Sequence, residues 1–216
     1  MDSLTIAVPT GRLLDGAATL LQTVGLPLDG LGEDRRLLIE FPGAARVLIA
    51  KPTDLLTYVE QGAADVGIVG RDMILEQRRD VYELLDLEFG ACRAVVAFPE
   101  TAAETIWQPG RVLRIATKYP RLTSRYFGEI GRPVEIVTLY GSVELAPLVG
   151  LSDGIVDLVM TGRTLQENHL REVAEIARST ARLVVNRSSL SRSARVAELV
   201  ARLEAHLRPE ERGVHV

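Results

Sequence analysis

Cysteine and histidine are scarce in this sequence, which has one cysteine, Cys92, and three histidines. A single cysteine excludes an internal disulfide, and its position in the apolar run ACRAVVAF favours a buried thiol over a nucleophile. The histidines, His169, His206 and His215, are scattered and lack metal-ligand spacing. No Ser/His/Asp arrangement, zinc motif or basic-aromatic patch is visible. We therefore expect neither a zinc site nor a nucleic-acid partner.

Long hydrophobic runs are missing as well. No segment approaches the ~20 apolar residues that a membrane-spanning helix needs. The N-terminus, MDSLTIAVPTGRL, carries an acid and a short apolar stretch instead of the basic start and long apolar core of a secretory signal. With the lone cysteine, this predicts a cytoplasmic protein without a membrane partner. Because the formal net charge is −4, a polyanionic ligand would have to meet locally placed cations and backbone amides.

What the sequence does contain is an alternation of short apolar runs with helical patterns. Continuous apolar runs are typical of strands that helices cover on both faces, and apolar residues at helical spacing predict amphipathic helices. The sequence therefore predicts an α/β protein with mainly parallel strands. The predicted strands are 4–8, 47–50, 66–69, 95–98, 112–116, 134–137, 155–159 and 183–186, the predicted helices are 13–23, 54–61, 121–130 and 191–207, and 101–110 and 208–216 are expected to be an irregular connection and a frayed tail.

The strongest local signal is the segment DGIVDLVMTGRTL at 153–165, which combines a buried strand, a Thr-Gly turn and a helix start. Gly162 allows the backbone to turn and to approach a ligand closely. Thr161 and Thr164 offer hydroxyl groups, and the amides of the helix start would favour a phosphate dianion. Arg163 could add a cation, although it could equally point to solvent. The alternative reading is an ordinary capped strand–turn–helix junction.

Two acidic residues could accompany this loop. Asp157 lies on the strand just before the turn, where a carboxylate could hold ribose hydroxyls or a metal ion. Glu144 follows another predicted strand, in the segment LYGSVELAP, where Ser142 and Glu144 are expected to begin a helix and Gly141 to allow a tight entry. Glu144 could also simply favour its helix N-terminus electrostatically.

Two further segments stand directly after predicted strands. In PTGRL, Gly11 opens a helix N-terminus, and Arg12 would lie at the carboxyl end of a strand, where α/β sheets bind ligands. In KPTD, Lys51 could contact phosphate. Each has a structural alternative, with Thr10 or Thr53 capping the next helix.

A third segment, GAADVGIVGRD, has glycines at both ends of a strand, which permit close backbone approach. It is not a dinucleotide fingerprint, because no G-x-G-x-x-G follows the strand.

Taken together, these segments resemble the ATP phosphoribosyltransferase family in its short catalytic form. The matching stretches run in the family's order from residue 5 to about residue 190, and they are PTGRL, KPTDLLTYVEQGAADVGIVGRD, VYELLDLEFGACRAVVAFPE, RIATKYPRLTSRYF, LYGSVELAPLVGLSDGIVDLVMTGRTLQENHL and STARLVVNRSSL. The resemblance implies a two-domain fold of the type II periplasmic-binding-protein kind, with the active site in the interdomain cleft. Domain I would comprise 1–92 plus 176–216, and domain II would comprise 93–175.

The resemblance also implies the reaction and its partners. The family joins adenine N1 of ATP to the anomeric carbon of phosphoribosyl pyrophosphate and releases pyrophosphate, with Mg2+ held mainly by the substrates. The short form works with a regulatory subunit similar to histidyl-tRNA synthetase, as an expected hetero-octamer, and forms a homodimer alone. Two alternatives stay open, namely a non-catalytic solute-binding protein with this fold and a phosphoribosyltransferase that uses a free base.

Site residues follow from the same resemblance. Arg12 and Arg36 are the expected catalytic cations, with Arg35 as a rival because the register there is uncertain. Thr10 departs from the lysine of many members, which lowers the local positive charge. The residues expected to bind phosphoribosyl pyrophosphate are Glu144, Asp157, Thr161, Gly162, Arg163, Thr164 and Leu165, and those expected to bind ATP are Gly11, Arg12, Lys51, Asp54, Gly70 and Asp72.

Overall fold

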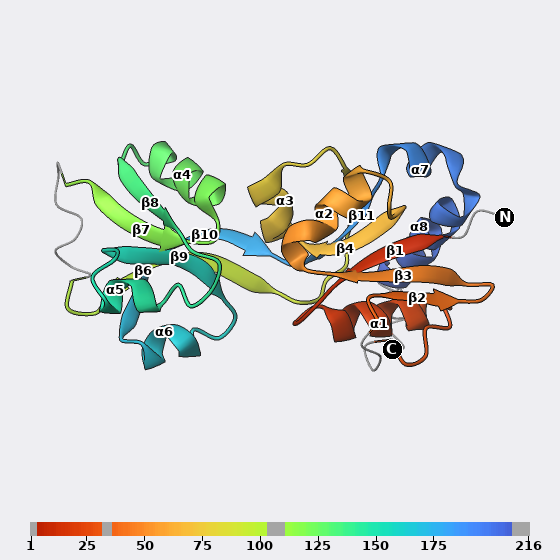
Figure 1. Ribbon diagram of the computed structural model, residues 1–216, viewed down its shortest axis with the longest axis horizontal. Coiled ribbons are helices and arrows are strands. Elements are labelled where there is room, and N and C mark those ends of the chain that lie inside the picture. The colour runs from red at the N-terminus through yellow and green to blue at the C-terminus, as the bar shows by residue number, and fades with distance from the viewer. Residues whose placement is uncertain (1–3, 32–35, 103–110, 209–216) are drawn as a thin grey trace, which may run out of the picture. The chain divides into compact units, whose positions relative to one another are not determined.

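The computed structural model describes residues 4–31, 36–102 and 111–208, so the expected irregular connection and tail lie almost entirely outside the described residues. Contacts divide the chain into two compact units, each built on one β-sheet (Figure 1). Unit 1 comprises Met1–Ile74, Arg78–Gly90 and Thr180–Val216, and unit 2 comprises Leu75–Gln77 and Ala91–Ser179. The chain therefore leaves unit 1 after Gly90 and returns to it at Thr180.

Unit 1 carries a sheet in the strand order β2-β3-β1-β4-β11-β5. The strands are β1 (Thr5–Pro9), β2 (Leu38–Phe41), β3 (Ala45–Ala50), β4 (Val66–Gly70), β5 (Tyr82–Asp86) and β11 (Ala181–Val185), and the helices are α1 (Leu14–Thr23), α2 (Pro52–Glu60), α3 (Arg71–Gln77, ending in unit 2), α7 (Arg187–Arg192) and α8 (Ala194–Leu207). The central strands β3, β1 and β4 are parallel, whereas β2, β11 and β5 are antiparallel to their neighbours.

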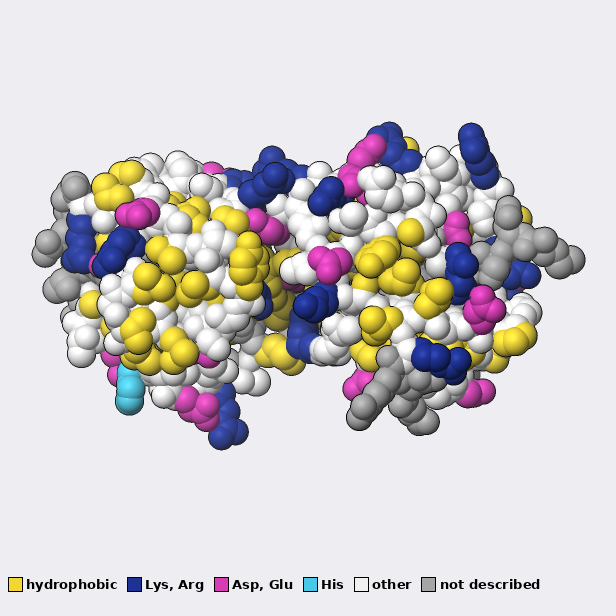
Figure 2. Space-filling view, viewed as in Figure 1, with side chains coloured by type: hydrophobic (Ala, Val, Ile, Leu, Met, Phe, Trp, Pro, Cys, Tyr) yellow, Lys and Arg dark blue, Asp and Glu magenta, His cyan; other side chains and the backbone are white. Residues whose placement is uncertain are grey.

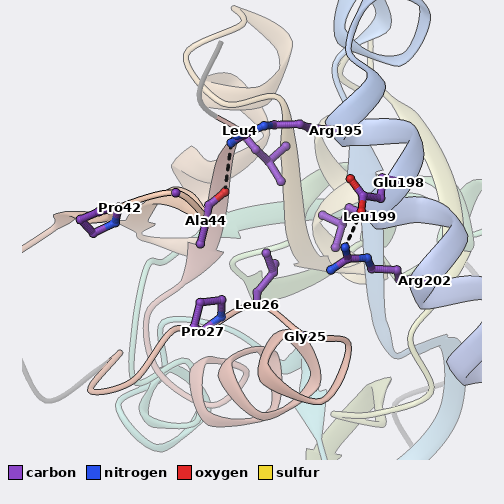
Figure 3. Close-up of a pocket in the computed structure, with 11 residues that line it drawn as sticks. Leu4, Gly25, Leu26, Pro27, Pro42, Ala44, Arg195, Glu198, Leu199 and Arg202 are labelled. Carbon is purple, nitrogen blue, oxygen red and sulfur yellow. Dashed lines mark hydrogen bonds and ion pairs between the residues drawn. The ribbon is translucent and has the colours of Figure 1, made fainter. Parts of the chain in front are cut away.

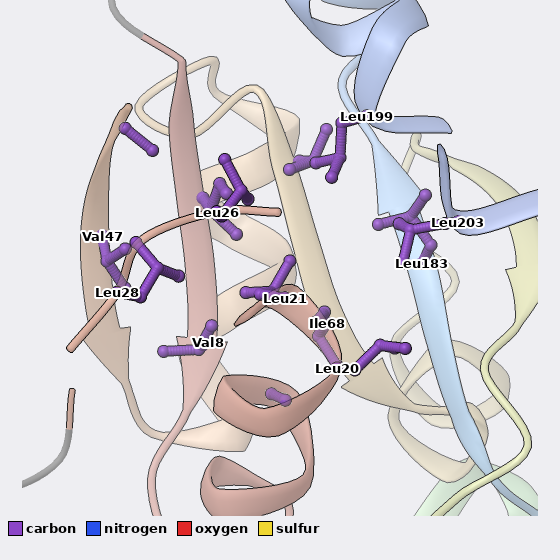
Figure 4. Packing of buried hydrophobic residues seen from close by; sticks show 14 of the residues in the cluster. Val8, Leu20, Leu21, Leu26, Leu28, Val47, Ile68, Leu183, Leu199 and Leu203 are labelled. Atoms are coloured by element: carbon purple, nitrogen blue, oxygen red, sulfur yellow. The ribbon is translucent and has the colours of Figure 1, made fainter. Parts of the chain in front are cut away.

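Helices cover both faces of this sheet. On one face, Leu21 of α1 and Leu203 of α8 pack with Val8, Ile68 and Leu183 of the strands, and all five side chains are buried (Figure 4). Because side chains alternate along a strand, the residues between these point to the other face, where α2 packs.

Gly67 of β4 explains how closely α2 approaches. A Cβ atom at this position would lie 2.7 Å from Leu55 Cδ2 and 2.8 Å from Val59 Cγ2, both on α2. The missing side chain therefore gives the helix room to lie directly on the strand.

Unit 2 carries the second sheet, in the order β10-β6-β9-β7-β8. The strands are β6 (Cys92–Pro99), β7 (Leu113–Thr117), β8 (Val134–Thr138), β9 (Gly154–Val159) and β10 (Leu170–Ser179), and the helices are α4 (Pro120–Glu129), α5 (Leu145–Leu148) and α6 (Arg163–Glu167). Strands β8, β7 and β9 are parallel, whereas β6 and β10 pair antiparallel. Two buried clusters, one around Val95, Ile155 and Val159 and one around Phe98 and Phe127, cover the two faces.

Two features of the sequence-based fold are wrong. The strands are not mainly parallel, because antiparallel strands extend the parallel strands of each sheet, on both sides in unit 1 and on one side in unit 2. The single helix expected at 191–207 is instead two helices, α7 and α8. They meet at Ser193, whose side chain accepts a hydrogen bond from Val196 N and caps α8.

The expectation for Cys92 is confirmed, because its thiol is buried in β6 and forms no disulfide. Within the described ranges, no helix is both long and apolar enough to cross a lipid bilayer. Large hydrophobic side chains nevertheless stay exposed around α5, including Tyr140 (89% exposed), Val149 (74%) and the half-exposed Leu145 and Leu148. Figure 2 shows hydrophobic side chains gathered on the surface of unit 2, which contains α5.

Candidate functional site

In unit 2, the candidate residues follow the carboxyl ends of three parallel strands. Register places Thr117 of β7 opposite Thr138 of β8 and opposite Val156 of β9. The loops that follow these strands must therefore emerge at one edge of the sheet. These loops carry Lys118, Glu144 and the turn after Asp157, so the topology brings distant parts of the chain together.

Asp157 lies within β9 and has a 24% exposed side chain. Its Oδ1 accepts a hydrogen bond from Leu158 N at 2.8 Å and lies 3.6 Å from Lys118 Nζ. Burial raises the pKa of Asp157 above its ordinary value and is the largest cause, and the carboxylate of Glu144 raises it further. The ammonium of Lys118 and the amide of Leu158 act in the opposite direction. The site is therefore a pair of neighbouring carboxylates beside one cation.

Lys118 is the functional candidate that sequence reasoning missed. Its signal was present, because it stands directly after a buried strand just as Lys51 does. Its closeness to Asp157, 39 positions away, follows only from the pairing of β7 with β9.

Glu144 occupies the N-cap position of α5, with φ −59° and no side-chain capping hydrogen bond. The helix begins at Leu145, after Ser142 and Glu144 rather than at them. The expected role of Gly141 is also wrong, because the positive φ of this loop falls on Ser142, at 45°. A non-glycine residue in that region carries local strain, and such residues concentrate at functional sites.

The turn after β9 has the geometry expected for close ligand approach. Gly162 adopts φ +79°, and no atom lies within 4 Å of where its Cβ would stand. Thr161 and Thr164 are exposed, whereas Leu165 is buried and anchors the short helix α6 to the core. The sequence left open whether Arg163 adds a cation to the turn or points to solvent. In the structure its Nε donates to Glu167 Oε1 at 2.8 Å along the exposed surface of α6. Hydroxyls and amides are thus the donors that the turn presents.

Unit 1 gathers its candidates at the carboxyl ends of β1, β3 and β4 in the same way. Pro9 pairs with Ala50 in register, and Thr10 N donates to Ala50 O at 2.8 Å. Arg12 follows Pro9 by three residues, Lys51 follows Ala50 directly, and both side chains are exposed.

Helix starts at this edge carry the acidic candidates. Asp54 is exposed in the first turn of α2, and Asp72 is buried in the first turn of α3, whose N-cap is Gly70. A carboxylate at such a position stabilises its own helix and repels phosphate. ATP contacts from these two residues would therefore involve hydroxyl or amino groups.

The structural alternatives for this edge are wrong in detail. The N-cap residues of α1 and α2 are Leu13 and Lys51, and neither helix has a side-chain capping hydrogen bond, so Thr10 and Thr53 do not cap them. Arg36 is exposed in the loop before β2, and its rival Arg35 lies outside the described residues.

Arg12 has a partner that the sequence did not indicate. Its guanidinium donates to the carbonyl of Gly90, the last residue of unit 1 before the chain enters unit 2. Gly90 has φ +66°, and a Cβ there would lie 2.1 Å from Leu13 Cδ2 and 3.3 Å from Arg12 Nη1. The left-handed φ favours glycine here, and the missing side chain leaves room for Leu13 and the Arg12 guanidinium.

A pocket of ≈ 460 Å³ in unit 1 contains none of these candidates. It lies at the opposite edge of the sheet, where Leu4 and Ala44 precede β1 and β3 (Figure 3). Its arginines are already engaged, since Arg195 donates to Ala44 O and Arg202 pairs with Glu198. Its volume alone therefore does not make it the substrate site.

The described residues include no group of three or more His, Cys, Asp or Glu side chains that could hold a metal ion. A Mg2+ ion held mainly by substrate phosphates and water would need no such group.

The fold defines a class of protein. It is the two-unit α/β fold of type II periplasmic binding proteins, because it superposes on Tv2483 bound to L-arginine with a TM-score of 0.60 over 94% of this chain and 82% of that chain. It also superposes on the extracellular-binding protein ytmK from Bacillus subtilis with a TM-score of 0.59, over 95% and 91% of the two chains. Sequence identities of 14% and 10% limit both similarities to the fold.

Closer similarities give the family. A family model described as ATP phosphoribosyltransferase matches residues 51–205. ATP phosphoribosyltransferase 2 of Geobacter sulfurreducens is 49% identical over 213 residues, covering 95% of this chain and 99% of that one, and the Moorella thermoacetica enzyme is 53% identical over 196 residues, covering 86% and 85%. The ATP phosphoribosyl transferase (HisG:HisZ) complex from Thermotoga maritima has a TM-score of 0.81 at 34% identity, covering 94% and 96%.

The chain therefore belongs to the ATP phosphoribosyltransferase family. Its reaction is the first step of L-histidine biosynthesis, in which phosphoribosyl is transferred from phosphoribosyl pyrophosphate to adenine N1 of ATP and pyrophosphate is released. The resemblance and the fold class predicted from the sequence are confirmed, and the enzyme is favoured over both alternatives.

Proposed function

We propose that unit 2 binds phosphoribosyl pyrophosphate through Asp157, Glu144 and the turn at 161–165, and that unit 1 binds ATP through the loops after β1, β3 and β4. The observation that carries the proposal is the half-buried carboxylate of Asp157, which has Glu144 close by and an exposed glycine turn at the end of its own strand. Paired carboxylates suit ribose hydroxyls, and exposed amides and hydroxyls suit a phosphate.

The chemistry assigns each group a task. Cleavage of the bond between ribose C1 and pyrophosphate gives the sugar oxocarbenium character and leaves negative charge on the leaving group. The carboxylates of Asp157 and Glu144 accept hydrogen bonds from the ribose hydroxyls and favour the positive sugar. Arg12 and Arg36 neutralise phosphate charge on the substrates. Mg2+, bound mainly by those phosphates, supplies further positive charge to the leaving pyrophosphate.

No general base is required before bond formation. Adenine N1 of neutral ATP has a lone pair and no proton, so it attacks C1 directly, and a proton leaves the exocyclic amine afterwards. The remaining contribution of the protein is to align two highly charged substrates. This agrees with a site built from carboxylates and cations.

The assembly and location belong to the same proposal. We infer a cytoplasmic enzyme that associates with a regulatory subunit similar to histidyl-tRNA synthetase. The structural similarity to a HisG:HisZ complex supports a hetero-oligomer, and the exposed hydrophobic side chains around α5, such as Tyr140 and Val149, are typical of a surface that meets another protein.

Pyrophosphate release tests the proposed substrates. With phosphoribosyl pyrophosphate and Mg2+ present, we expect release with ATP and none above background with free adenine, guanine or uracil. Removal of Mg2+ with a chelator should suppress the reaction, because pyrophosphate then leaves without its counter-ion. Release with a free base but not with ATP would contradict the proposal.

Gly162→Val tests the phosphate turn. No protein atom lies within 4 Å of where its Cβ would stand, but φ +79° is strained for a β-branched residue by about 1–3 kcal/mol, so the turn should shift. We expect KM for phosphoribosyl pyrophosphate to rise about tenfold, while KM for ATP stays within about twofold. Gly131→Val is the matched control, because Gly131 has φ +68° and equally open surroundings away from the site. Equal KM changes in both variants would count against the turn.

A further inference from the structure

Lys118 stands in register with Asp157 on the neighbouring strand. Thr117, the last residue of β7, pairs with Val156 of β9, so the residues that follow them, Lys118 and Asp157, lie side by side. The Lys118 Nζ atom is 3.6 Å from Asp157 Oδ1, and the two side chains are 38% and 24% exposed. This ion pair is partly sheltered, so water screens it less than a pair on the open surface.

On the side away from Lys118, Asp157 has mainly apolar neighbours. On its second side, β9 pairs with β6, which places the buried Val95 opposite Asp157. Ile155 and Val159, on the same face of β9, are buried in an apolar cluster. Among the described residues, the groups that act on the pKa of this carboxylate are Lys118, the Leu158 amide and the second carboxylate, Glu144. Arg93, opposite Val159 on β6, pairs with Glu172 and Glu175.

We propose that Lys118 is a positioning residue for the reaction, which holds Asp157 ionised and aimed so that it can accept the ribose hydroxyls. This role rests on the proposed function of Asp157. Lysine suits it because its ammonium is a compact point charge on a flexible stem. The choice is distinctive in this chain, where lysine occurs only at 51 and 118 among 25 basic residues.

Removal of the Lys118 charge has a defined consequence. Two carboxylates in a sheltered site disfavour simultaneous ionisation, so one of them takes up a proton at higher pH when no cation is near. A protonated Asp157 accepts fewer hydrogen bonds and no longer favours positive charge on the sugar. Activity would then fall at a pH where the native enzyme still works.

The pH dependence of kcat/KM for phosphoribosyl pyrophosphate measures this effect. The acid limb is the low-pH range in which kcat/KM falls as the site takes up a proton, and in Lys118→Gln we expect it to move to higher pH. At a pH within the acid limb of the native enzyme, kcat/KM of the variant should then fall on the order of tenfold more than it does at the pH of maximal activity. Lys118→Arg should restore the limb, because it keeps the charge. Arg111→Gln is the matched control, since it removes the cation of another ion pair beside β9, the 2.6 Å contact with Asp153, and should leave the limb in place.

A direct phosphate contact would give a different result. If Lys118 only bound a substrate phosphate, Lys118→Gln would raise KM equally at all pH values, and the acid limb would not move. That outcome would overturn the inference and leave Asp157 in its proposed role. Full activity of Asp157→Asn would remove the proposed function of Asp157 and this inference with it.

A measurement that does not depend on turnover further separates the proposed role of Lys118 from that of Asp157. Reductive methylation with 13C-formaldehyde keeps lysine charged and adds NMR-visible methyl groups, so the two lysines give two signals beside that of the N-terminal amine, and Lys118→Arg assigns them. The Lys118 signal should titrate with the acid limb of the native enzyme and lose that titration in Asp157→Asn, while the Lys51 signal stays unaffected. A flat Lys118 signal in active enzyme would overturn the inference even if Asp157 proved essential.

Discussion

Gly154→Ala should destabilise the protein by about 3 kcal/mol and lower its Tm by roughly 10 °C. Gly154 is the first residue of β9, between β6 and β7. A Cβ there would lie 2.2 Å from Phe98 Cδ1, 2.4 Å from Phe98 Cε1 and 2.8 Å from the carbonyl oxygen of Ala97. Neither neighbour can retreat, because Phe98 is fully buried and the Ala97 carbonyl belongs to the paired strand.

Gly128→Ala is the matched control for this substitution. Gly128 lies in the last turn of α4, and no atom lies within 4 Å of where its Cβ would stand. The same methyl group should stabilise the helix by up to about 0.5 kcal/mol, because alanine loses less backbone entropy than glycine on folding. Thermal unfolding followed by circular dichroism compares the two variants. Similar Tm values for both would mean that the β6–β9 packing is looser than these distances imply.

This close packing shows which strands the sequence could reveal. Strands buried on both faces, such as β4 and β9, appear as continuous apolar runs and were predicted within one or two residues. β10 and β5 were missed, because LREVAEIARS and YELLD mix charged and apolar residues. Such mixed patterns suit edge strands with a half-exposed face, and both lie at sheet edges, where they also make the sheets less parallel than expected.

The residues of the candidate site also differ in whether the sequence alone could reveal them. Asp157, Glu144 and Gly162 could be found from the sequence, because residues after buried strands share one edge of an α/β sheet. The contacts of Lys118 with Asp157 and of Arg12 with Gly90 could not, because the residues of these pairs are 39 and 78 positions apart. Sequence reasoning thus located the edges that carry the loops, and the strand register was needed to pair their residues.

Asp157→Asn should lower kcat/KM for phosphoribosyl pyrophosphate by about 100-fold without loss of stability. A hydrogen bond to a charged group contributes about 1.5–3 kcal/mol, and the lost negative charge no longer favours the positive sugar, so a barrier increase of about 2.7 kcal/mol is expected.

The stability expectation follows from the direction of the pKa shift. The pKa of Asp157 is raised on folding, with burial as the largest cause, so the folded state holds its proton more tightly than the unfolded state does. The stability present below the ordinary value of 3.8 is therefore lost as the pH rises through the folded pKa. Once ionised, the carboxylate costs stability, and asparagine removes that cost.

Asp153→Asn is the control, because Asp153 directly precedes the same strand but its carboxylate is held by hydrogen bonds from other residues of the protein. Its side chain is 13% exposed, and it accepts hydrogen bonds from Arg111 Nη2 at 2.6 Å and from Arg114 N at 2.8 Å. Here we expect the reverse pattern, with a stability loss of about 1–2 kcal/mol and kcat/KM within about threefold of the native value. Steady-state kinetics and urea unfolding on both variants give the comparison. If Asp157→Asn kept its activity and lost stability as Asp153→Asn does, Asp157 would be a structural residue and the ribose site would lie elsewhere.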